Sequence, residues 1–462
     1  MAYYSAENYS VVKNWETPKP SSDDLQFESR FESGNLSLAF RSLVDPHAYV
    51  LLLDNDTNTV GYNKWFNFTV SNAKKDAIYS FYIVNFRKNF SFFKQGLRPT
   101  RFSLQEHFMI GNGWGKCGRN IQMYKSKISL NKKMQSTQYY TLSFDVTFEH
   151  HNDVCSFSLL PPYSYSRLTN FLKSSEEGCR ERRDINFEMK TIAYTLANTQ
   201  VPYVTISGRQ PSKKNILIMA RQHPGEVWSS FLAEALIKEL LRESKGECEW
   251  LLRHFTFRVV PMVNIDGVTY GNFRCDLGGN DLNRSWRYPN KVLHPQILPI
   301  TQEVSRLAKE EEVVCCLDLH AHSKDLGVFA YCCKPDAQGR LLPLLISRAT
   351  PLFLFPSCTY GVSNYKKTTA RAIINEITNA DHVLTIEASF YATPTKLLHP
   401  ASFISVAIAI LKALHQYHSQ SEELHKAKQE LPKAMAEAAA MRNNINQNDE
   451  EESGSDSEPD CD

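Results

Sequence analysis

The pattern of apolar and polar positions divides the chain into two parts with different periodicities. Within residues 25–165, short aromatic and β-branched runs, such as those at 65–70, 78–86 and 139–148, alternate with turn-rich stretches, which is typical of antiparallel strands. Within residues 166–420, apolar runs alternate with segments of helical periodicity, which indicates a mixed, mostly parallel sheet flanked by helices. We therefore predict an N-terminal antiparallel β-sandwich domain followed by an α/β domain.

The two ends of the chain lack these patterns. Residues 1–24 are polar with little periodicity, so we expect a flexible leader. Residues 421–441 are rich in Glu, Lys and Ala and predict an exposed helix that is limited by Pro432. Residues 449–462 are acidic and contain Ser and Gly, which favours disorder. Residues 421–462 are thus predicted to be a helix followed by an acidic, disordered tail.

Two of the predicted strands in the second part end beside side chains that bind metals. The apolar run 215–221 is followed by His223-Pro-Gly-Glu226 and then by a segment with helical periodicity. The apolar run 313–320 ends at His320. Open α/β sheets place their ligands at the carboxyl ends of the strands, and catalytic zinc sites commonly use two histidines and one glutamate. An isolated His-x-x-Glu pair is more often structural, but the joint placement of these three residues favours a zinc site.

Two further segments carry ionisable groups suited to catalysis. The apolar run 381–387 ends in a lone carboxylate, Glu387, and an ionisable residue in that position needs a partner or a chemical task. Near a metal-bound water, Glu387 would act as a general base. The segment 280–286 and the nearby Arg274 supply two arginines and asparagine side chains, which could bind a carboxylate by hydrogen bonds, bidentate ones from the arginines.

Together these motifs resemble those of the zinc metallocarboxypeptidases of the carboxypeptidase A type, and more specifically those of the cytosolic carboxypeptidases. The resemblance covers roughly residues 25–420 and implies the zinc carboxypeptidase fold for the α/β domain. It rests on the segments 260–267, 271–275, 281–284, 320–323, 369–371 and 387–390, and on 31–35, 65–68 and 162–167 in the first third of the chain.

The resemblance implies a role for each residue of the predicted metal centre. His223, Glu226 and His320 match the ligands of one zinc ion per chain. Asp281 matches the acid that orients the first zinc histidine. Glu387 matches the general base, which takes a proton from the attacking water and hands it to the leaving amine.

The resemblance also implies how a substrate is held. Arg274 would polarise the scissile carbonyl and stabilise the oxyanion, while Asn283 and Arg284 would bind the terminal carboxylate. Tyr365 lies near the place of the tyrosine that covers the substrate in digestive carboxypeptidases. Arg371 matches the basic residue through which cytosolic carboxypeptidases select glutamate; the other interpretation is a helix residue on the surface.

From this resemblance we expect removal of C-terminal or side-chain-linked glutamates from polyglutamylated proteins, chiefly tubulin. Two other functions remain open. One is that of an aspartoacylase-like zinc amidohydrolase acting on small acidic N-acyl amino acids, and the other is that of an inactive protein that binds acidic tails. The sandwich domain has two interpretations, a folding support or a wall of the substrate cleft, and we favour the support.

Composition adds few constraints. The 462 residues carry a formal charge of +2 and 11 cysteines, with adjacent pairs at 315–316 and 332–333 that fit a reduced core better than disulfides. The apolar run 403–414 is too short to span a bilayer and predicts a buried helix. We expect a monomeric cytoplasmic protein with no nucleic-acid or membrane partner and no secretion signal. The resemblance adds association with microtubules or cilia.

Overall fold

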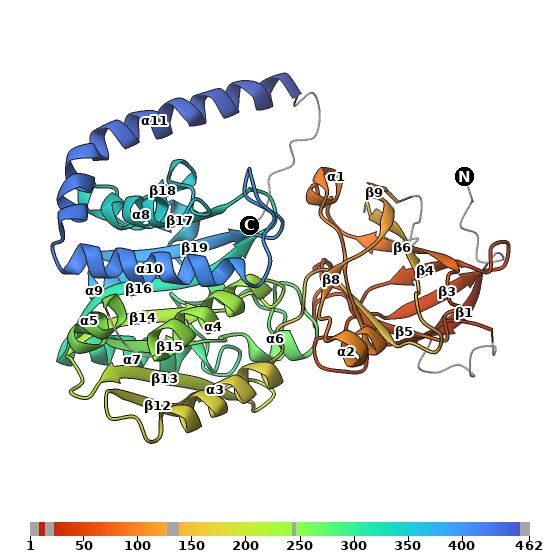
Figure 1. The fold of residues 1–462 in the computed structure, drawn as a ribbon, viewed down its shortest axis with the longest axis horizontal. Helices are drawn as coiled ribbons and strands as arrows, with labels where there is room; N and C mark the ends of the chain where they lie inside the picture. Colours follow the sequence, from red (N-terminus) through yellow and green to blue (C-terminus); the bar gives the residue numbers. More distant parts are fainter. Residues whose placement is uncertain (1–8, 14–22, 127–137, 243–245, 453–462) are drawn as a thin grey trace.

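The computed structural model of the chain describes residues 9–13, 23–126, 138–242 and 246–452, with backbone only for residues 9–13 and 443–452. Two sheets built from the first part of the chain lie at one end of the molecule, and a third sheet with its helices lies at the other (Figure 1). The predicted fold class, an antiparallel sandwich before a mixed sheet flanked by helices, is confirmed.

The first two sheets are antiparallel except for one parallel pair, β4 with β6. Aromatic side chains fill the space between them because alternate strand residues point inward; the rings of Phe68, Phe81 and Phe157 meet there, with Phe157 5.8 Å from Phe68 and 5.6 Å from Phe81. The six-stranded sheet has the order β1 (Tyr9–Lys13), β3 (Leu38–Ser42), β4 (Ala48–Leu52), β6 (Ile78–Phe86), β10 (Tyr140–Thr147) and β9 (Arg119–Lys125). The five-stranded sheet has the order β2 (Gln26–Glu28), β5 (Asn67–Ser71), β11 (Cys155–Ser158), β7 (Thr100–Ser103) and β8 (Gly115–Lys116), and the short helices α1 (Phe92–Gln95) and α2 (Leu104–Ile110) join the strands.

The N-terminal segment differs from the flexible leader expected over residues 1–24. Residues 9–13 form β1, which pairs with β3 in antiparallel fashion and extends the six-stranded sheet. The prediction is wrong for these residues because a short strand needs no apolar periodicity of its own when a neighbouring strand supplies its hydrogen bonds. Residues 1–8 and 14–22 lie outside the described part of the chain.

The third sheet is mixed and has eight strands. Its centre, formed by β15, β14, β16 and β19, is parallel, and both flanks are joined to it by antiparallel pairs. The central strands are apolar on both faces because helices cover both sides. In order, the strands are β12 (Ile185–Tyr194), β13 (Gln200–Gly208), β15 (Thr256–Val260), β14 (Lys214–Ala220), β16 (Glu312–His322), β19 (His382–Ser389), β17 (Val328–Cys332) and β18 (Thr359–Tyr360).

The helices of this part form two groups. The helix α10, which contains the apolar run 403–414, packs against α4, α5 and α8, whereas α7 packs against α9. Their bounds are α3 (Tyr165–Cys179), α4 (Val227–Leu241), α5 (Glu247–His254), α6 (Ile265–Thr269), α7 (Ile297–Glu310), α8 (Ala337–Ala349), α9 (Ala370–Thr378) and α10 (Ser402–His418), with 3₁₀ turns η3 (Leu282–Arg284), η4 (Phe355–Ser357) and η5 (Asn364–Lys366). Among the described residues, no helix combines the length and the apolar character needed to cross a bilayer. The ten cysteines of the described residues are free, including the two adjacent pairs.

The last helix, α11 (Glu422–Glu452), runs beyond the limit predicted at Pro432, which lies inside it. Packing against α8 and η4 outweighs the backbone hydrogen bond that proline removes, and the Arg442 Nε donates to the Pro356 carbonyl at 2.8 Å. Residues 449–452, predicted to be disordered, belong to the helix, and residues 453–462 lie outside the described residues.

Candidate active site

The carboxyl ends of β14 and β16 bring three metal-binding side chains together. His223 and Glu226 lie between the end of β14 and the start of α4, and His320 lies on β16, which pairs in parallel with β14. The Nδ1 atoms of His223 and His320 lie 2.6 Å and 2.9 Å from the two carboxylate oxygens of Glu226. One ligand atom from each residue lies within 4.8 Å of the other two, and all three residues are buried. The three predicted ligand residues therefore converge on one point.

The outer nitrogen of each histidine meets a carboxylate. His223 Nε2 lies 3.1 Å from Asp281 Oδ1, and His320 Nε2 lies 3.1 Å from Asp318 Oδ2. Asp318 is fully buried, and the amide of Gln222 donates to its other oxygen at 2.7 Å. The sequence analysis missed Asp318, although an acid two positions before a histidine in an apolar strand points to the same side of the sheet and needs a partner there.

This arrangement fits a zinc ion. In metal sites, a histidine that binds through one nitrogen usually donates its other N–H to a carboxylate, which fixes the ring orientation. Burial lowers the pKa of the His320 imidazole, but the carboxylates of Asp318 and Glu226 outweigh it, so this pKa lies well above its usual value. Burial alone would raise the pKa of the Glu226 carboxyl, but the His223 and His320 imidazoles outweigh this effect and bring that pKa far below its usual value. Zinc displaces the Nδ1 proton of an imidazole when it binds, and two buried imidazoles with one anionic carboxylate are a common catalytic zinc set.

Glu387 lies on β19, directly opposite His320 in the parallel register. Its side chain lines the same cavity as the three predicted ligand residues. Burial raises the pKa of the Glu387 carboxyl, while the His320 imidazole acts in the opposite direction. Its Oε2 atom has no hydrogen-bond partner within the described residues, so one buried oxygen remains available to a bound molecule.

The loop that follows α6 forms a second side of the cavity. The Nε and Nη2 atoms of Arg274 lie 2.9 Å and 2.7 Å from Asp281 Oδ2, so Asp281 contacts both Arg274 and His223. Asn283 and Arg284 lie in η3 and line the cavity. The Asn283 side-chain carbonyl accepts the N–H of Ala370 at 3.0 Å, which joins this loop to the start of α9.

Arg371 lies in the first turn of α9 and also lines the cavity. It is 6% exposed, so the alternative of a surface helix residue is wrong. Its Nη1 atom lies 3.4 Å from the carbonyl oxygen of Gly361 and 3.9 Å from the Cys333 sulfur. No acidic side chain forms an ion pair with it in the part of the chain that the structure describes.

Tyr365 does not join this group. It lies in η5 with 77% of its surface exposed and is not among the residues that line the cavity. The adjacent Lys366 and the ring of Tyr331 do line it. The sequence spacing places Tyr365 in the correct loop, but the 3₁₀ turn directs its side chain to solvent.

The cavity measures about 590 Å³ and is strongly basic. One of its basic residues, Lys64, comes from the sandwich, so the expectation that this domain serves only as a support is incomplete. The lining includes two acidic residues, Glu226 and Glu387, and six basic ones: Lys64, Arg274, Arg284, Lys324, Lys366 and Arg371.

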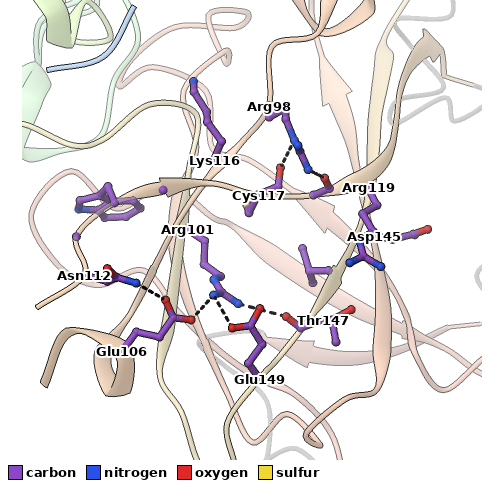
Figure 2. Close-up of a pocket in the computed structure, with 15 residues that line it drawn as sticks. Arg98, Arg101, Glu106, Asn112, Lys116, Cys117, Arg119, Asp145, Thr147 and Glu149 are labelled. Carbon is purple, nitrogen blue, oxygen red and sulfur yellow. Dashed lines mark hydrogen bonds and ion pairs between the residues drawn. The ribbon is translucent and has the colours of Figure 1, made fainter. Parts of the chain in front are cut away.

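A second cavity, of about 510 Å³, lies in the sandwich and also has basic residues (Figure 2). Its charges are largely balanced by protein groups. Arg101 forms ion pairs with Glu106 and Glu149, and Arg98 donates to the backbone carbonyls of Cys117 and Gly118. Glu106, Glu149 and His150 form a second group that could hold a metal, but none of the three is buried, so we place the candidate active site at the sheet of the α/β part.

Comparison with known proteins agrees with this geometry. A sequence profile of the zinc carboxypeptidases matches residues 175–337. The chain is 36% identical over 364 residues to Cytosolic carboxypeptidase 2 of Xenopus tropicalis, and this alignment covers 76% of the chain and 36% of the relative. It is 33% identical over 387 residues to Cytosolic carboxypeptidase 1 of Homo sapiens, and this alignment covers 76% of the chain and 31% of the relative. The chain thus spans about a third of the length of these curated relatives.

Two solved structures share the fold over both parts of the chain. A metallo-carboxypeptidase from Burkholderia cenocepacia aligns with a TM-score of 0.68 and 18% identity, over 86% of this chain and 99% of that one. A metallo-carboxypeptidase from Pseudomonas aeruginosa, in complex with (2-guanidinoethylmercapto)succinic acid, aligns with a TM-score of 0.66 and 19% identity, over 84% of this chain and 98% of that one. With the sequence matches and the convergent His-Glu-His set, the chain belongs to the zinc carboxypeptidase family, within which it is similar to the cytosolic carboxypeptidases.

Proposed function

We propose that this protein is a zinc-dependent carboxypeptidase that removes glutamate residues from polyglutamylated protein tails, such as those of tubulin. The observation that carries the proposal is Arg371, a buried guanidinium that lines the cavity without an acidic partner among the described residues. A buried charge is costly unless a counter-charge pairs with it. The side-chain carboxylate of a glutamate is a counter-charge that a substrate would bring.

The metal centre would be held by His223, Glu226 and His320. When bound, zinc lowers the pKa of a water molecule and polarises a carbonyl group. Glu387, whose Oε2 atom has no hydrogen-bond partner within the described residues, would take the proton of the attacking water and pass it to the leaving amine. Asp281 and Asp318 would keep the two imidazoles in the orientation that presents Nδ1 to the metal.

The rest of the cavity would bind the end of a polypeptide. Asn283 and Arg284 would hold the terminal α-carboxylate, and this restricts cleavage to the last residue of a chain. The guanidinium of Arg274 would stabilise the oxyanion that forms during attack. With Arg371 binding the side chain, an apolar terminal residue would leave a buried charge unpaired, which gives strong discrimination.

The charge of the cavity supports an acidic substrate beyond the terminal residue itself. Six basic residues against two acidic ones produce a positive potential that attracts a run of glutamates. We propose that the protein acts in the cytosol, as the names of its relatives suggest, where microtubules and cilia offer polyglutamylated tubulin. We propose also that it acts as a monomer.

The test compares two peptides that differ in their last residue, one ending in Glu and one in Leu. Arg371→Met should lower kcat/KM for the Glu peptide by about 100-fold or more, because a buried charge pair is lost, and should change cleavage of the Leu peptide much less. Lys367→Ala is the matched control, since it removes a nearby exposed charge that does not line the cavity.

An equal loss on both peptides would place the side-chain pocket elsewhere. Assaying N-acetylaspartate alongside the peptides separates a carboxypeptidase from a small-molecule amidohydrolase. Linear and branched glutamylated peptides, digested in parallel, define the preferred linkage. Zinc-loaded protein that binds the Glu peptide without cleaving it would instead identify an inactive binding protein.

A further inference from the structure

The loop that carries Arg274 is held by an acidic residue of the sandwich. The carboxylate of Asp56 accepts three consecutive backbone N–H groups, from Phe273 at 2.6 Å, Arg274 at 2.7 Å and Cys275 at 2.8 Å. Asp56 precedes Phe273 by 217 residues and is 1% exposed. Consecutive N–H groups that point to one side form an anion-binding concavity, so Asp56 acts as the fixed anion of that concavity.

Further contacts fix the same loop against the sandwich. The Asn35 side-chain amide donates to the Gly271 carbonyl at 3.0 Å, and the Thr57 N–H donates to Asn272 Oδ1 at 3.0 Å. Gly271 has a φ of +73°, and a Cβ there would lie 2.4 Å from the carbonyl oxygen of Gly34. Only glycine allows this conformation with the backbone of the sandwich so close.

On its other side, the loop contacts the metal-binding motif. The Phe273 carbonyl accepts the N–H of Gly225 at 2.7 Å. A Cβ on Gly225 would lie 2.4 Å from the ring of Phe273, so the two segments are in close contact. Arg274 in turn binds Asp281, which binds His223. A continuous series of contacts thus runs from Asp56 through Arg274 to the predicted zinc ligand.

We propose that Asp56 is a positioning residue for catalysis, through which the sandwich holds the Arg274 guanidinium where the oxyanion forms. The inference rests on the proposed function, since it assigns the conformation of Arg274 to that reaction. The sandwich is then part of the active site. It fixes the conformation of the loop that carries Arg274, and it also forms part of the cavity wall. Without the carboxylate, three buried N–H groups lose their acceptor, and the loop adopts a conformation that satisfies them in another way.

The test measures kcat and KM of Asp56→Asn with a glutamate-ending peptide, in wild-type and Arg274→Ala backgrounds. In the wild-type background we expect kcat to fall by about 10- to 100-fold, the cost of a small displacement of a catalytic group, with little change in KM. In the Arg274→Ala background, the same substitution should lower kcat by less than about twofold, because residues that act as a unit are not additive. Thr57→Val is the control: it removes a hydroxyl that bonds to Asn272 across the same interface and should leave kcat unchanged.

Equal losses in the two backgrounds would overturn the proposal, because a purely structural contact weakens both enzymes alike. A rise in KM with unchanged kcat would do so as well. If Asp56→Asn does not fold, Asp56→Ser, which keeps one acceptor, is held to the same criterion. If neither variant folds, Asp56 is a folding residue and the proposal is rejected. A folded wild-type enzyme that leaves the peptide uncut refutes the proposed function instead.

Discussion

The predicted zinc ligands and Arg274 face the same cavity, yet they are positioned by different kinds of contact. His320 lies on β16, and His223 and Glu226 lie in the short segment that joins the adjacent parallel strand β14 to α4. Arg274 lies on a loop whose backbone is bound by Asp56, a residue 218 positions earlier in the chain. The first group depends on one sheet, whereas the second depends on how two parts of the molecule pack together.

This difference suggests a division of tasks. Metal ligands must be held within about 0.5 Å of their working positions, and the regular elements that flank them here, β14, α4 and β16, provide such precision. Loops are less rigid, so a loop that carries a catalytic group needs supporting contacts of its own. The sandwich supplies them here through Asp56 and Asn35. We therefore expect substitution of the predicted metal ligands to affect metal binding and substitution of Asp56 to affect turnover.

The largest expected effect is on the strand side. His223→Ala should remove about one zinc per chain, as measured by metal analysis, and lower kcat/KM by about 1000-fold or more, because the Lewis acid is lost. Circular dichroism and thermal unfolding should show that the sandwich remains folded. His322→Gln is the control, since it changes a neighbouring histidine that also lines the cavity but lies outside the His-Glu-His group. Full zinc content with full activity in His223→Ala would end the zinc hypothesis.

The two carboxylates behind the histidines sharpen the comparison. Asp318 contacts His320 alone among the predicted ligands, while Asp281 contacts both His223 and Arg274. Asp318→Asn should weaken zinc affinity by about 10- to 100-fold, with kcat restored by excess zinc. Asp281→Asn should weaken zinc affinity similarly, but kcat should stay low at saturating zinc because Arg274 loses its ion pair. Restoration of both variants by zinc would show that the loop is independent of Asp281.

The same contrast explains what the sequence could predict. His223, Glu226 and His320 were predictable because each follows an apolar run, and parallel strands bring their ends together. Asp318 carried a weaker signal, an acid inside an apolar strand. Asp56 carried none, because an aspartate in a turn-rich stretch is common and only the folded chain brings it beside Phe273–Cys275. Contacts between distant segments are not encoded in any local pattern.

One other error has a physical cause of the same kind. A helix over residues 421–441 was expected to be limited by Pro432, but contacts with α8 and η4 keep α11 helical through this proline. Tertiary packing here outweighed a rule based on residue type. Tyr365, matched to the tyrosine that covers the substrate, lies exposed in η5, and its role stays a prediction.

The opposite end of the Glu387 strand gives a third prediction, on pH. His382 begins β19, and burial lowers its pKa from 6.5 to about 3, with His418 and Lys334 adding to the effect. In the unfolded chain, His382 therefore binds a proton below about pH 6.5. In the folded chain, it binds this proton only below about pH 3. Stability is unaffected above pH 6.5 and falls as the pH drops, by about 2 kcal/mol at pH 5 for this group.

His382→Phe should reduce this loss, since neither ring nitrogen of His382 has a hydrogen-bond partner within the described residues and a ring of similar size keeps the contact with Tyr417. Urea unfolding at pH 7.5 and pH 5 measures the difference. An identical pH dependence in the two proteins would show that His382 is not the group responsible. Because His382 is far along the strand from Glu387, activity at neutral pH should stay unchanged.

The smallest expected effect concerns Lys64, which the sandwich contributes to the cavity. Its Nζ lies 5.6 Å and 5.7 Å from the ring centroids of Phe90 and Phe273, within range of a cation–π interaction with each. Acidic residues that precede the terminal glutamate would meet this charge. Lys64→Gln should therefore raise KM several-fold for a glutamate-rich peptide at low salt, with kcat unchanged, and the effect should diminish as salt screens the charge.

The control Lys74→Gln removes an exposed sandwich charge away from the cavity. A peptide with neutral residues before the final glutamate should be cut equally well by both variants. If Lys64→Gln instead lowers kcat and leaves KM unchanged, Lys64 acts with Asp56 in holding the loop that carries Phe273 and Arg274. The sandwich then affects turnover through the position of this loop and does not affect the affinity for substrate.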